Sequence, residues 1–286
     1  CNMCCTRLWE RSNMTDAKNW QGYFVQSLGD CHFIHSSWKL NDKCVFGYDS
    51  DYTTMAISLL RLLSIENPKL TLSTFDERIN LEVVKAATGL EINPSGYHLK
   101  CNDDASLQIY PDDPATFSLS RENMQNIDRE IYEKLILAWQ TESNILNTSQ
   151  GAYVSGQQYD ETLESRLSLV AQNHEGLIWP QRQMDSEGRI ISESLIKIEP
   201  YGEVISWTKL SAAGAPSEFA IRAPILGGIS TVMVETRDGP NGVFLLVDDV
   251  PTTPKIGDSV EIVVRMLYAQ EGAVRYGAKA IITNHS

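Results

Sequence analysis

Six cysteines could bind a metal ion or attack an acyl group, and their positions separate these two chemistries. Cys1 and Cys4 have the two-residue spacing of a zinc knuckle, but no second pair with that spacing follows. Cys101 is the one cysteine in a position that a nucleophile could occupy, because it follows an expected helix. The neighbouring Asp103 and Asp104 would raise the pKa of its thiol. A half-buried, unreactive Cys101 is therefore the favoured interpretation, and an acyl-accepting thiolate is the alternative.

Carboxylate, aromatic and basic side chains supply further candidates for binding. Asp49 and Asp51 have the spacing of a metal pair, but an Asp-x-Asp sequence at a helix start more often caps the helix. Trp207 and Tyr268 could line a ligand groove, whereas aromatic residues on barrel strands usually belong to the core. The basic residues best suited to meet phosphate groups or a partner protein, with solvated surface as the alternative for each, are Arg182, Arg265, Arg275 and Lys279.

The composition is that of an acidic globular protein. The 286 residues carry a formal net charge of −13 and a sequence pI near 4.8, so the long-range field repels nucleic acid and anionic lipid. No run of about eighteen apolar residues occurs, and we expect no membrane span. The first residues lack the order of a secretory signal, which makes the cytoplasm the default location. Residues 1–13 are interpreted as a disordered leader, because Met14 could be the true start.

Apolar residues in the first half of the chain recur at helical spacing. One helix is expected over residues 51–63, capped by Asp51 or Thr53, and another over residues 77–88, ended by Gly89. Residues 70–74 between them are strand-like, so this segment has α/β order. A third helix is expected over residues 122–142. The polar residues 143–158 are interpreted as a linker between two domains.

After about residue 195 the period of the apolar residues changes from that of a helix to that of a strand. Residues 238–242, Asp-Gly-Pro-Asn-Gly, predict a hairpin connection between two of the strands. These features indicate a small antiparallel β-barrel or sandwich. The expected strands cover residues 195–198, 202–210, 217–222, 229–237, 242–247, 259–267 and 274–283.

An ordered series of residues in this half resembles a known family. The series is Tyr201–Thr208, Ala223-Pro224, the strand pair around Gly239, Ile256–Val260, and then Tyr268 and Tyr276. It is similar to the acyl-CoA-associated proteins that carry a zinc ribbon and an OB fold, domain of unknown function family thirty-five. The match covers roughly residues 160–284. It implies an OB-fold barrel over residues 196–286, preceded by a ribbon over residues 159–195.

The resemblance also implies that the ribbon has lost its metal. In the family, two Cys-x-x-Cys knuckles flank a Pro-Pro-Arg turn, and Trp179-Pro180-Gln181-Arg182 resembles that turn. The four ligand positions then hold no cysteine, so a tetrahedral zinc site is not expected. We expect Leu177, Ile178 and Trp179 to pack inward instead. The residues at the ligand positions are Gln172, Glu175, Asp185 and Gly188.

The first half has a second resemblance. Residues 48–56, Ser73-Thr74, the helix over residues 80–90, and residues 103–107 and 111–113 are similar to the 3-hydroxy-3-methylglutaryl-CoA synthases, a branch of the thiolase fold. That resemblance implies a thiolase-like fragment over residues 14–142. Enzymes of this branch need a nucleophilic Cys, a general-base Glu and a His. About a hundred residues cannot hold their duplicated domain.

Together these observations predict an α+β protein: an α/β thiolase-like fragment, a degenerate zinc ribbon and a C-terminal OB-fold barrel. The family resemblance implies a non-catalytic accessory subunit that binds a thiolase-fold enzyme and shapes its acyl-CoA site. An acyltransferase that uses Cys101 is the alternative. No bound metal or cofactor is expected, although CoA or acyl-CoA could be shared with the partner. The candidate ligand-binding or partner-binding residues are Trp179, Arg182, Trp207, Arg265, Tyr268 and Arg275.

Overall fold

A computed structural model describes residues 17–119, 121, 123–146, 155–173, 176–179, 181–182, 184–189, 194–237, 239–249 and 252–283. The chain forms two units, one ending at Asp128 and the other beginning at Arg129. Both helices and several sheets are present, so the α+β class is confirmed. None of the helices within the described ranges is long and apolar enough to cross a membrane.

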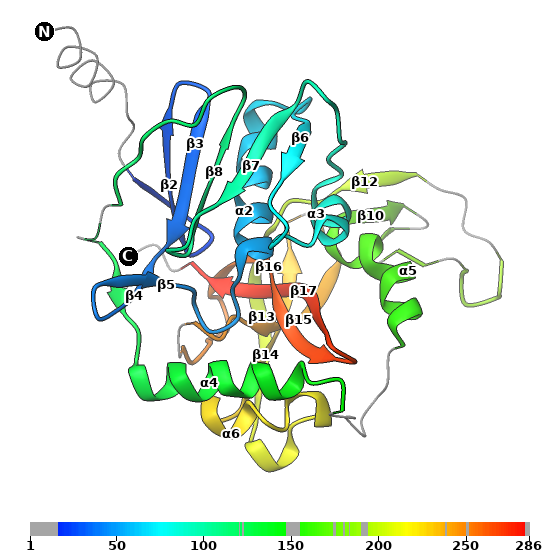
Figure 1. The fold of residues 1–286 in the computed structure, drawn as a ribbon. Helices are drawn as coiled ribbons and strands as arrows, with labels where there is room; N and C mark the ends of the chain where they lie inside the picture. Colours follow the sequence, from blue (N-terminus) through cyan, green and yellow to red (C-terminus); the bar gives the residue numbers. More distant parts are fainter. Residues whose placement is uncertain are drawn as a thin grey trace, which may run out of the picture. The chain divides into compact units, whose positions relative to one another are not determined.

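The first unit contains a six-stranded sheet (Figure 1). Its neighbouring strands are antiparallel except for β6 and β7, which run parallel. A second sheet has the order β5-β4-β9. The six strands, in sheet order, are β1 (Lys18–Trp20), β2 (Tyr23–Leu28), β3 (Cys31–Ser36), β8 (Ser106–Tyr110), β7 (Tyr97–Cys101) and β6 (Leu72–Phe75). The three strands of the second sheet are β4 (Trp38–Leu40), β5 (Lys43–Val45) and β9 (Gln125–Asn126).

Two helices of the first unit follow the predicted pattern with shifted ends. Helix α2 (Tyr52–Glu66) contacts β3 and β8, and Asp51 caps it through a capping box with Thr54. Helix α3 (Leu81–Thr88) ends at Gly89 in the left-handed conformation, as expected, but begins four residues later than predicted. The reason is that the Asn80 side chain accepts a hydrogen bond from the Val83 N–H and so caps the helix there. The predicted strand at residues 70–74 is β6.

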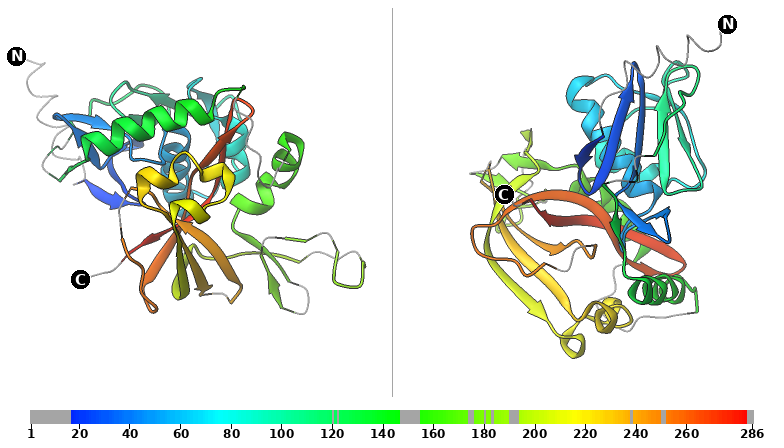
Figure 2. Two further views of the ribbon diagram at one scale, coloured as in Figure 1. Left: turned by 90° about the horizontal axis from the view of Figure 1, so that it is seen from below. Right: turned by 90° about the vertical axis from the view of Figure 1, so that its left-hand side faces the viewer.

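Helix α4 (Arg129–Glu142) also begins later than predicted, because residues 125 and 126 form β9. Helix α4 contacts β16 and α6 of the second unit, and Figure 2 shows it running beside α6. The two units therefore divide before α4, whereas we expected the division within residues 143–158. Helix α5 (Gly156–Leu167) begins at the end of that expected linker, and residues 147–154 lie outside the described part of the chain.

A three-stranded sheet in the second unit precedes the barrel. Its order is β11-β10-β12, with both pairs antiparallel. Residues 195–198 were expected in the barrel, but β12 pairs with β10 instead. We refer to this as the small sheet, formed by β10 (Val170–Asn173), β11 (Leu177–Ile178) and β12 (Leu195–Lys197).

The barrel is closed, with the strand order β13-β14-β15-β17-β16. In this order β13 and β14, β14 and β15, and β16 and β17 pair antiparallel. Strands β15 and β17 pair in parallel, so the expectation of a wholly antiparallel barrel is wrong. Five strands in this closed order form an OB-like barrel. Its strands are β13 (Tyr201–Leu210), β14 (Ile229–Thr236), β15 (Asn241–Leu246), β16 (Ser259–Gln270) and β17 (Ala273–Ile282).

Residues 217–222 do not form the predicted strand. They lie in a connection made of short helical turns: η1 (Ala212–Gly214), η2 (Ser217–Phe219) and α6 (Ala223–Leu226). Pro224 occupies the first turn of α6, where its missing N–H does no harm. Phe219, Ala223 and Ile229 then form a small apolar cluster, which fixes this connection.

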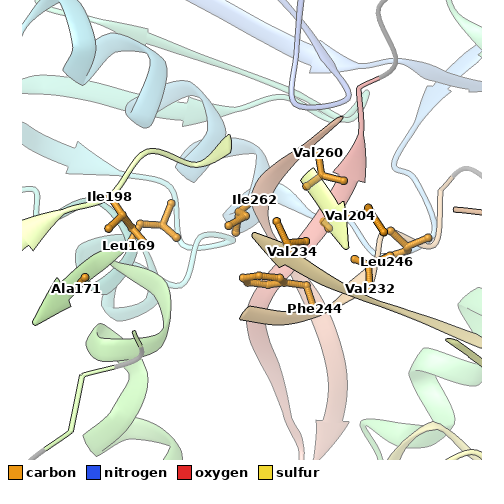
Figure 3. Packing of buried hydrophobic residues seen from close by; sticks show 11 residues of the cluster. Leu169, Ala171, Ile198, Val204, Val232, Val234, Phe244, Leu246, Val260 and Ile262 are labelled. Atoms are coloured by element: carbon orange, nitrogen blue, oxygen red, sulfur yellow. The ribbon is translucent and has the colours of Figure 1, made fainter. Parts of the chain in front are cut away.

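One apolar core joins the small sheet to the barrel, as Figure 3 shows. Leu169, Ala171 and Ile198 come from the segments around the small sheet. Val204, Val232, Val234, Phe244, Leu246, Val260, Ile262 and Ala280 come from the barrel strands. The small sheet and the barrel are therefore one packing unit, because neither buries this surface alone.

Candidate functional site

The Cys101 thiol lies in a closed environment at the end of β7. The residue is 3% exposed, and burial raises the pKa of its thiol to about 12, with the Asp76 carboxylate adding to the effect. The expected direction of the shift is correct, but its main cause is burial rather than Asp103 and Asp104. On the order of one thiol in 10⁵ is ionised at pH 7 with such a pKa, so Cys101 is a poor nucleophile here.

Arg78 holds the loop that follows Cys101. Its Nη2 donates to the Cys101 carbonyl oxygen at 2.8 Å, and its Nη1 lies 3.1 Å from an Asp103 carboxylate oxygen. The Asp76 carboxylate accepts from Arg78 Nε at 2.9 Å, and this hydrogen bond holds the pKa of Asp76 well below its usual range. The guanidinium also lies over the Tyr52 ring, 4.8 Å from its centroid. These contacts fix the loop as a structural element.

The other cysteines do not assemble a metal site within the described residues. Cys44 is buried, and burial raises the pKa of its thiol to about 12. Cys31 is half-buried and its thiol donates to the Asp113 carbonyl oxygen. No cluster of three His, Cys, Asp or Glu side chains suited to a metal is found in the part of the chain that the structure describes. Cys1 and Cys4 lie outside that part.

Trp179 joins the small sheet to the barrel. Its ring stacks on Phe244 of β15, with centroids 5.5 Å apart and an interplanar angle of 25°. Leu177 and Trp179 both pack against the core cluster, so their predicted inward packing is confirmed. Ile178 is half-buried. The Trp179 side chain thus has a role within the chain, in addition to any role with a partner.

At two of the four positions compared with metal ligands, the side chain accepts hydrogen bonds from backbone N–H groups. Gln172 is buried, and its Oε1 accepts from the Arg182 N–H at 3.1 Å. The Asp185 carboxylate accepts from the backbone N–H groups of Glu187 and Arg189, at 2.8 and 2.9 Å, and from Arg189 Nε at 2.7 Å. Gly188 adopts a φ of +78° in this turn. Glu175 lies outside the described residues.

The exposed candidates are Arg182 and Trp207. Arg182 is exposed at the end of the turn that follows Trp179, and Trp207 on β13 is 41% exposed. Trp207 is therefore not the core residue that the alternative interpretation assumed. Tyr268 is half-buried and meets Phe219 edge to face, with ring centroids 6.1 Å apart. Tyr268 belongs to the small cluster around Phe219.

The remaining basic candidates are buried, so the solvated-surface alternative is wrong for them. Arg265 is 1% exposed, and its Nη1 donates to the Val264 carbonyl oxygen. Arg275 is 6% exposed and lies over the Tyr159 ring, 4.7 Å from its centroid. Lys279 is 1% exposed, with its Nζ 3.0 Å from an Asp248 carboxylate oxygen. Sequence alone predicts exposure for such residues because Arg and Lys are rarely buried unless paired.

A buried ionic network was not predicted from the sequence. Arg222 is 1% exposed; its Nε lies 2.8 Å from a Glu142 carboxylate oxygen, and its Nη1 lies 3.4 Å from the Asp248 oxygen that also meets Lys279. The guanidinium stacks on the Trp139 ring at 3.9 Å. Burial raises the pKa of Glu142, and the charge of Arg222 opposes that shift. One signal was present: Glu142 falls on the same helical face as Leu135 and Trp139.

Comparison with known proteins gives little that bears on this site. No family model matches the chain, and no curated protein matches it. Among solved structures, a chain described as "Ltp2-ChsH2(DUF35) aldolase" is similar, with 17% identity over 45% of this chain and 97% of that chain and a TM-score of 0.31. A likeness at that level carries no argument. The OB-like assignment rests on the strand pairings of the barrel.

Proposed function

We propose that the protein is a non-catalytic accessory subunit that binds a thiolase-fold enzyme and helps to shape its acyl-CoA site. The observation that carries the proposal is the environment of Cys101. This thiol was the one candidate nucleophile, and it is buried, with its pKa raised to about 12 and Arg78 bonded to its carbonyl oxygen. A buried thiol with a raised pKa is suited to packing in the core and not to attack on an acyl group.

The association part of the proposal rests on the second unit. The small sheet and the OB-like barrel share one core, so they pack as one unit that can present a surface. Arg182 is exposed on the turn that Gln172 holds, and Arg is frequent among residues that dominate interfaces. The resemblance of residues 160–284 to acyl-CoA-associated proteins supports an acyl-CoA enzyme as the partner. CoA or acyl-CoA would be shared with that partner.

Reconstitution with a thiolase, a ketosynthase or a 3-hydroxy-3-methylglutaryl-CoA synthase homologue from the same source tests the association. We expect a complex by sedimentation velocity, weakened at least about tenfold by Arg182→Ala. The matched control is Arg189→Ala, which removes a cation of similar exposure in the same segment that is already paired with Asp185. Equal affinity of the two variants would contradict the role of Arg182. A failure of every candidate enzyme to bind would contradict the accessory function itself.

Zinc content tests the interpretation of the small sheet as a ribbon without its metal. We expect less than stoichiometric zinc in the purified chain, because Gln172 and Asp185 already accept hydrogen bonds from the backbone N–H groups of Arg182, Glu187 and Arg189. Elemental analysis of the wild-type chain and of a Cys1→Ser, Cys4→Ser variant measures this directly. One zinc per wild-type chain that the variant loses would place a metal site at the N-terminal cysteines instead.

A further inference from the structure

Strand β12 is an edge of the small sheet. The order β11-β10-β12 places β10 in the centre, and β12 pairs with β10 alone among the described strands. All three residues of β12 are exposed. An unpaired edge offers a row of N–H and C=O groups to another extended chain.

The backbone bonds show which groups face the free edge. The Ile198 N–H donates to the Leu169 carbonyl oxygen at 2.9 Å, and the Asn173 N–H donates to the Ser194 carbonyl oxygen at 2.8 Å. Bonding residues alternate along an antiparallel pair. The backbone groups of Ser194, Ile196 and Ile198 therefore point toward β10, and those of Leu195 and Lys197 point away from it.

The side chains beside this edge are apolar and basic. Leu195 is 52% exposed, and Lys197 lies on the same face two residues further on. Gln172 lies directly opposite Leu195 on β10, and its Oε1 accepts a hydrogen bond from the Arg182 N–H. Arg182 therefore lies near the same face of the small sheet. Neither Arg182 nor Lys197 forms an ion pair with any described carboxylate. Among the described residues, this face of a chain with a net charge of −13 therefore carries two cations that have no ion-pair partner.

We propose that β12 accepts an extended acidic segment of a partner protein as an added strand. Strand addition supplies hydrogen bonds from Leu195 and Lys197, and opposite charges across the new pair add to its stability. A second copy of this chain is disfavoured, because pairing β12 with itself brings Lys197 and Arg182 of two copies together. Lys on an edge strand usually discourages pairing. Here it discourages basic and identical strands while it admits acidic ones.

This proposal rests on the proposed function only for the identity of the partner. Its test therefore uses peptide probes and the full chain alone, so that its failure leaves the accessory function standing. The probes are acetylated hexapeptides of alternating Glu and Val, and of alternating Lys and Val. The readout is amide hydrogen exchange at residues 194–198, followed by NMR, with peptide affinity from the same titration.

In the free chain we expect fast exchange at Leu195 and Lys197 and slow exchange at Ile196 and Ile198. The Glu-Val peptide should slow exchange at Leu195 and Lys197, and the Lys-Val peptide should not. Equal effects of both peptides, or no effect of the acidic one, would overturn the proposal. Slow exchange at Leu195 and Lys197 before any peptide is added would also overturn it if the protection grows with protein concentration, because a second copy then occupies the edge.

Two variants locate the binding. Leu195→Pro removes a donor that faces the free edge and leaves the bonds to β10 intact, a place where an edge strand tolerates proline. We expect the variant to lower the affinity for the Glu-Val peptide at least about tenfold, while the amides of Ile196 and Ile198 remain protected from hydrogen exchange. Arg182→Glu with Lys197→Glu should reverse the preference, so that the Lys-Val peptide binds better. Undiminished binding by Leu195→Pro, or an unchanged preference after charge reversal, contradicts strand addition at β12.

Discussion

The two units bury polar side chains of different kinds. Around α2 in the first unit they are almost all neutral, such as Gln21, Thr54 and Ser58, with Asp49 as the exception. In the second unit many are charged, with Arg222, Glu142 and Lys279 among them. A buried neutral group needs hydrogen bonds, whereas a buried charge needs an opposite charge as well. In the second unit this requirement joins segments that are distant in the sequence through buried ion pairs.

The ionic network shows this consequence for the second unit. Glu142 ends α4, Arg222 precedes α6, and Asp248 follows β15, so three segments meet at one guanidinium. In the first unit, the ion pair between Arg78 and Asp103 also joins remote residues, but both side chains are exposed. There the Tyr23 hydroxyl meets Thr54, and Thr54 itself completes the cap of α2. Exposed ion pairs contribute little to stability, so the first unit depends mainly on caps, neutral hydrogen bonds and packing, and the second also depends on buried ion pairs between remote segments.

The largest effect is expected from Arg222→Ala. It leaves the buried Glu142 without its cation and removes one of the two cations beside Asp248, which costs about 3–5 kcal/mol of the free energy of unfolding. Urea unfolding measures the loss. The control is Arg237→Ala, which breaks the exposed pair with Glu199 and should cost no more than about 1 kcal/mol. Similar losses in both variants would remove the distinction between buried and exposed charges.

A smaller loss is expected from Trp179→Ala. The change removes the ring that stacks on Phe244 and opens the core shared by the small sheet and the barrel, at about 2 kcal/mol for a half-buried side chain. Trp207→Ala, at a more exposed ring on β13, should cost less than about 1 kcal/mol. If the two losses in urea unfolding were the same, Trp179 would not join the small sheet to the barrel.

The neutral network of the first unit should respond more weakly. Tyr23→Phe removes the hydroxyl that lies 3.0 Å from Thr54 Oγ1, at about 1 kcal/mol. Thr54 Oγ1 still donates to the Asp51 carbonyl oxygen and accepts from the Asp51 N–H. The free energy of unfolding of the variant measures the effect. A loss as large as that of Arg222→Ala would mean that neutral and ionic networks contribute alike.

His35 gives the first unit a dependence on pH. It is fully buried, its Nδ1 lies 2.8 Å from the Ser36 carbonyl oxygen, and burial lowers its pKa. The unfolded chain therefore binds the proton more readily, so the stabilisation is present above about pH 6.5 and is lost as pH falls below it. Burial also lowers the pKa of His32, so the test compares His32→Asn with His32→Asn, His35→Asn.

Unfolding of the two His variants is followed between about pH 7.5 and about pH 5. The single variant should lose stability as the pH falls, and the double variant should lose less. The asparagine introduced by His35→Asn does not titrate in this range, and its amide can still donate toward the Ser36 carbonyl oxygen. Parallel pH profiles of the two proteins would show that His35 does not titrate on unfolding.

Local rules predicted the parts of the fold that local chemistry determines. The cap at Asp51, the end of α3 at Gly89 and the alternation of β13 to β17 follow from neighbouring residues. Residues 217–222 were predicted as a strand because they lie in the half of the chain whose apolar residues follow the period of a strand, but Pro216 and Pro224 and the packing of Phe219 favour helical turns. The start of the second unit at α4 depends on Arg222, which is remote in sequence.

The candidate site was predicted only in part, because its contacts join residues that are not neighbours in the sequence. The closed environment of Cys101 depends on Asp76 and Arg78, which a strand and a helix separate from it. The burial of Arg265, Arg275 and Lys279 depends on the closing of the barrel, and Lys279 also pairs with Asp248, which is remote in sequence. No local pattern encodes such pairings. The inward packing of Trp179 was predictable because exposing three consecutive apolar side chains, Leu177, Ile178 and Trp179, to water is unfavourable.

The acyl-transfer rate of a reconstituted complex that contains Cys101→Ala tests the central claim most directly. If the chain is a non-catalytic subunit, the rate should stay within about threefold of the wild-type complex, less than 1 kcal/mol of barrier. Cys101→Ser serves as the control for any change in packing around the buried thiol. A fall of several orders of magnitude in both variants, with the complex still assembled, would show that Cys101 is the nucleophile and would contradict the account.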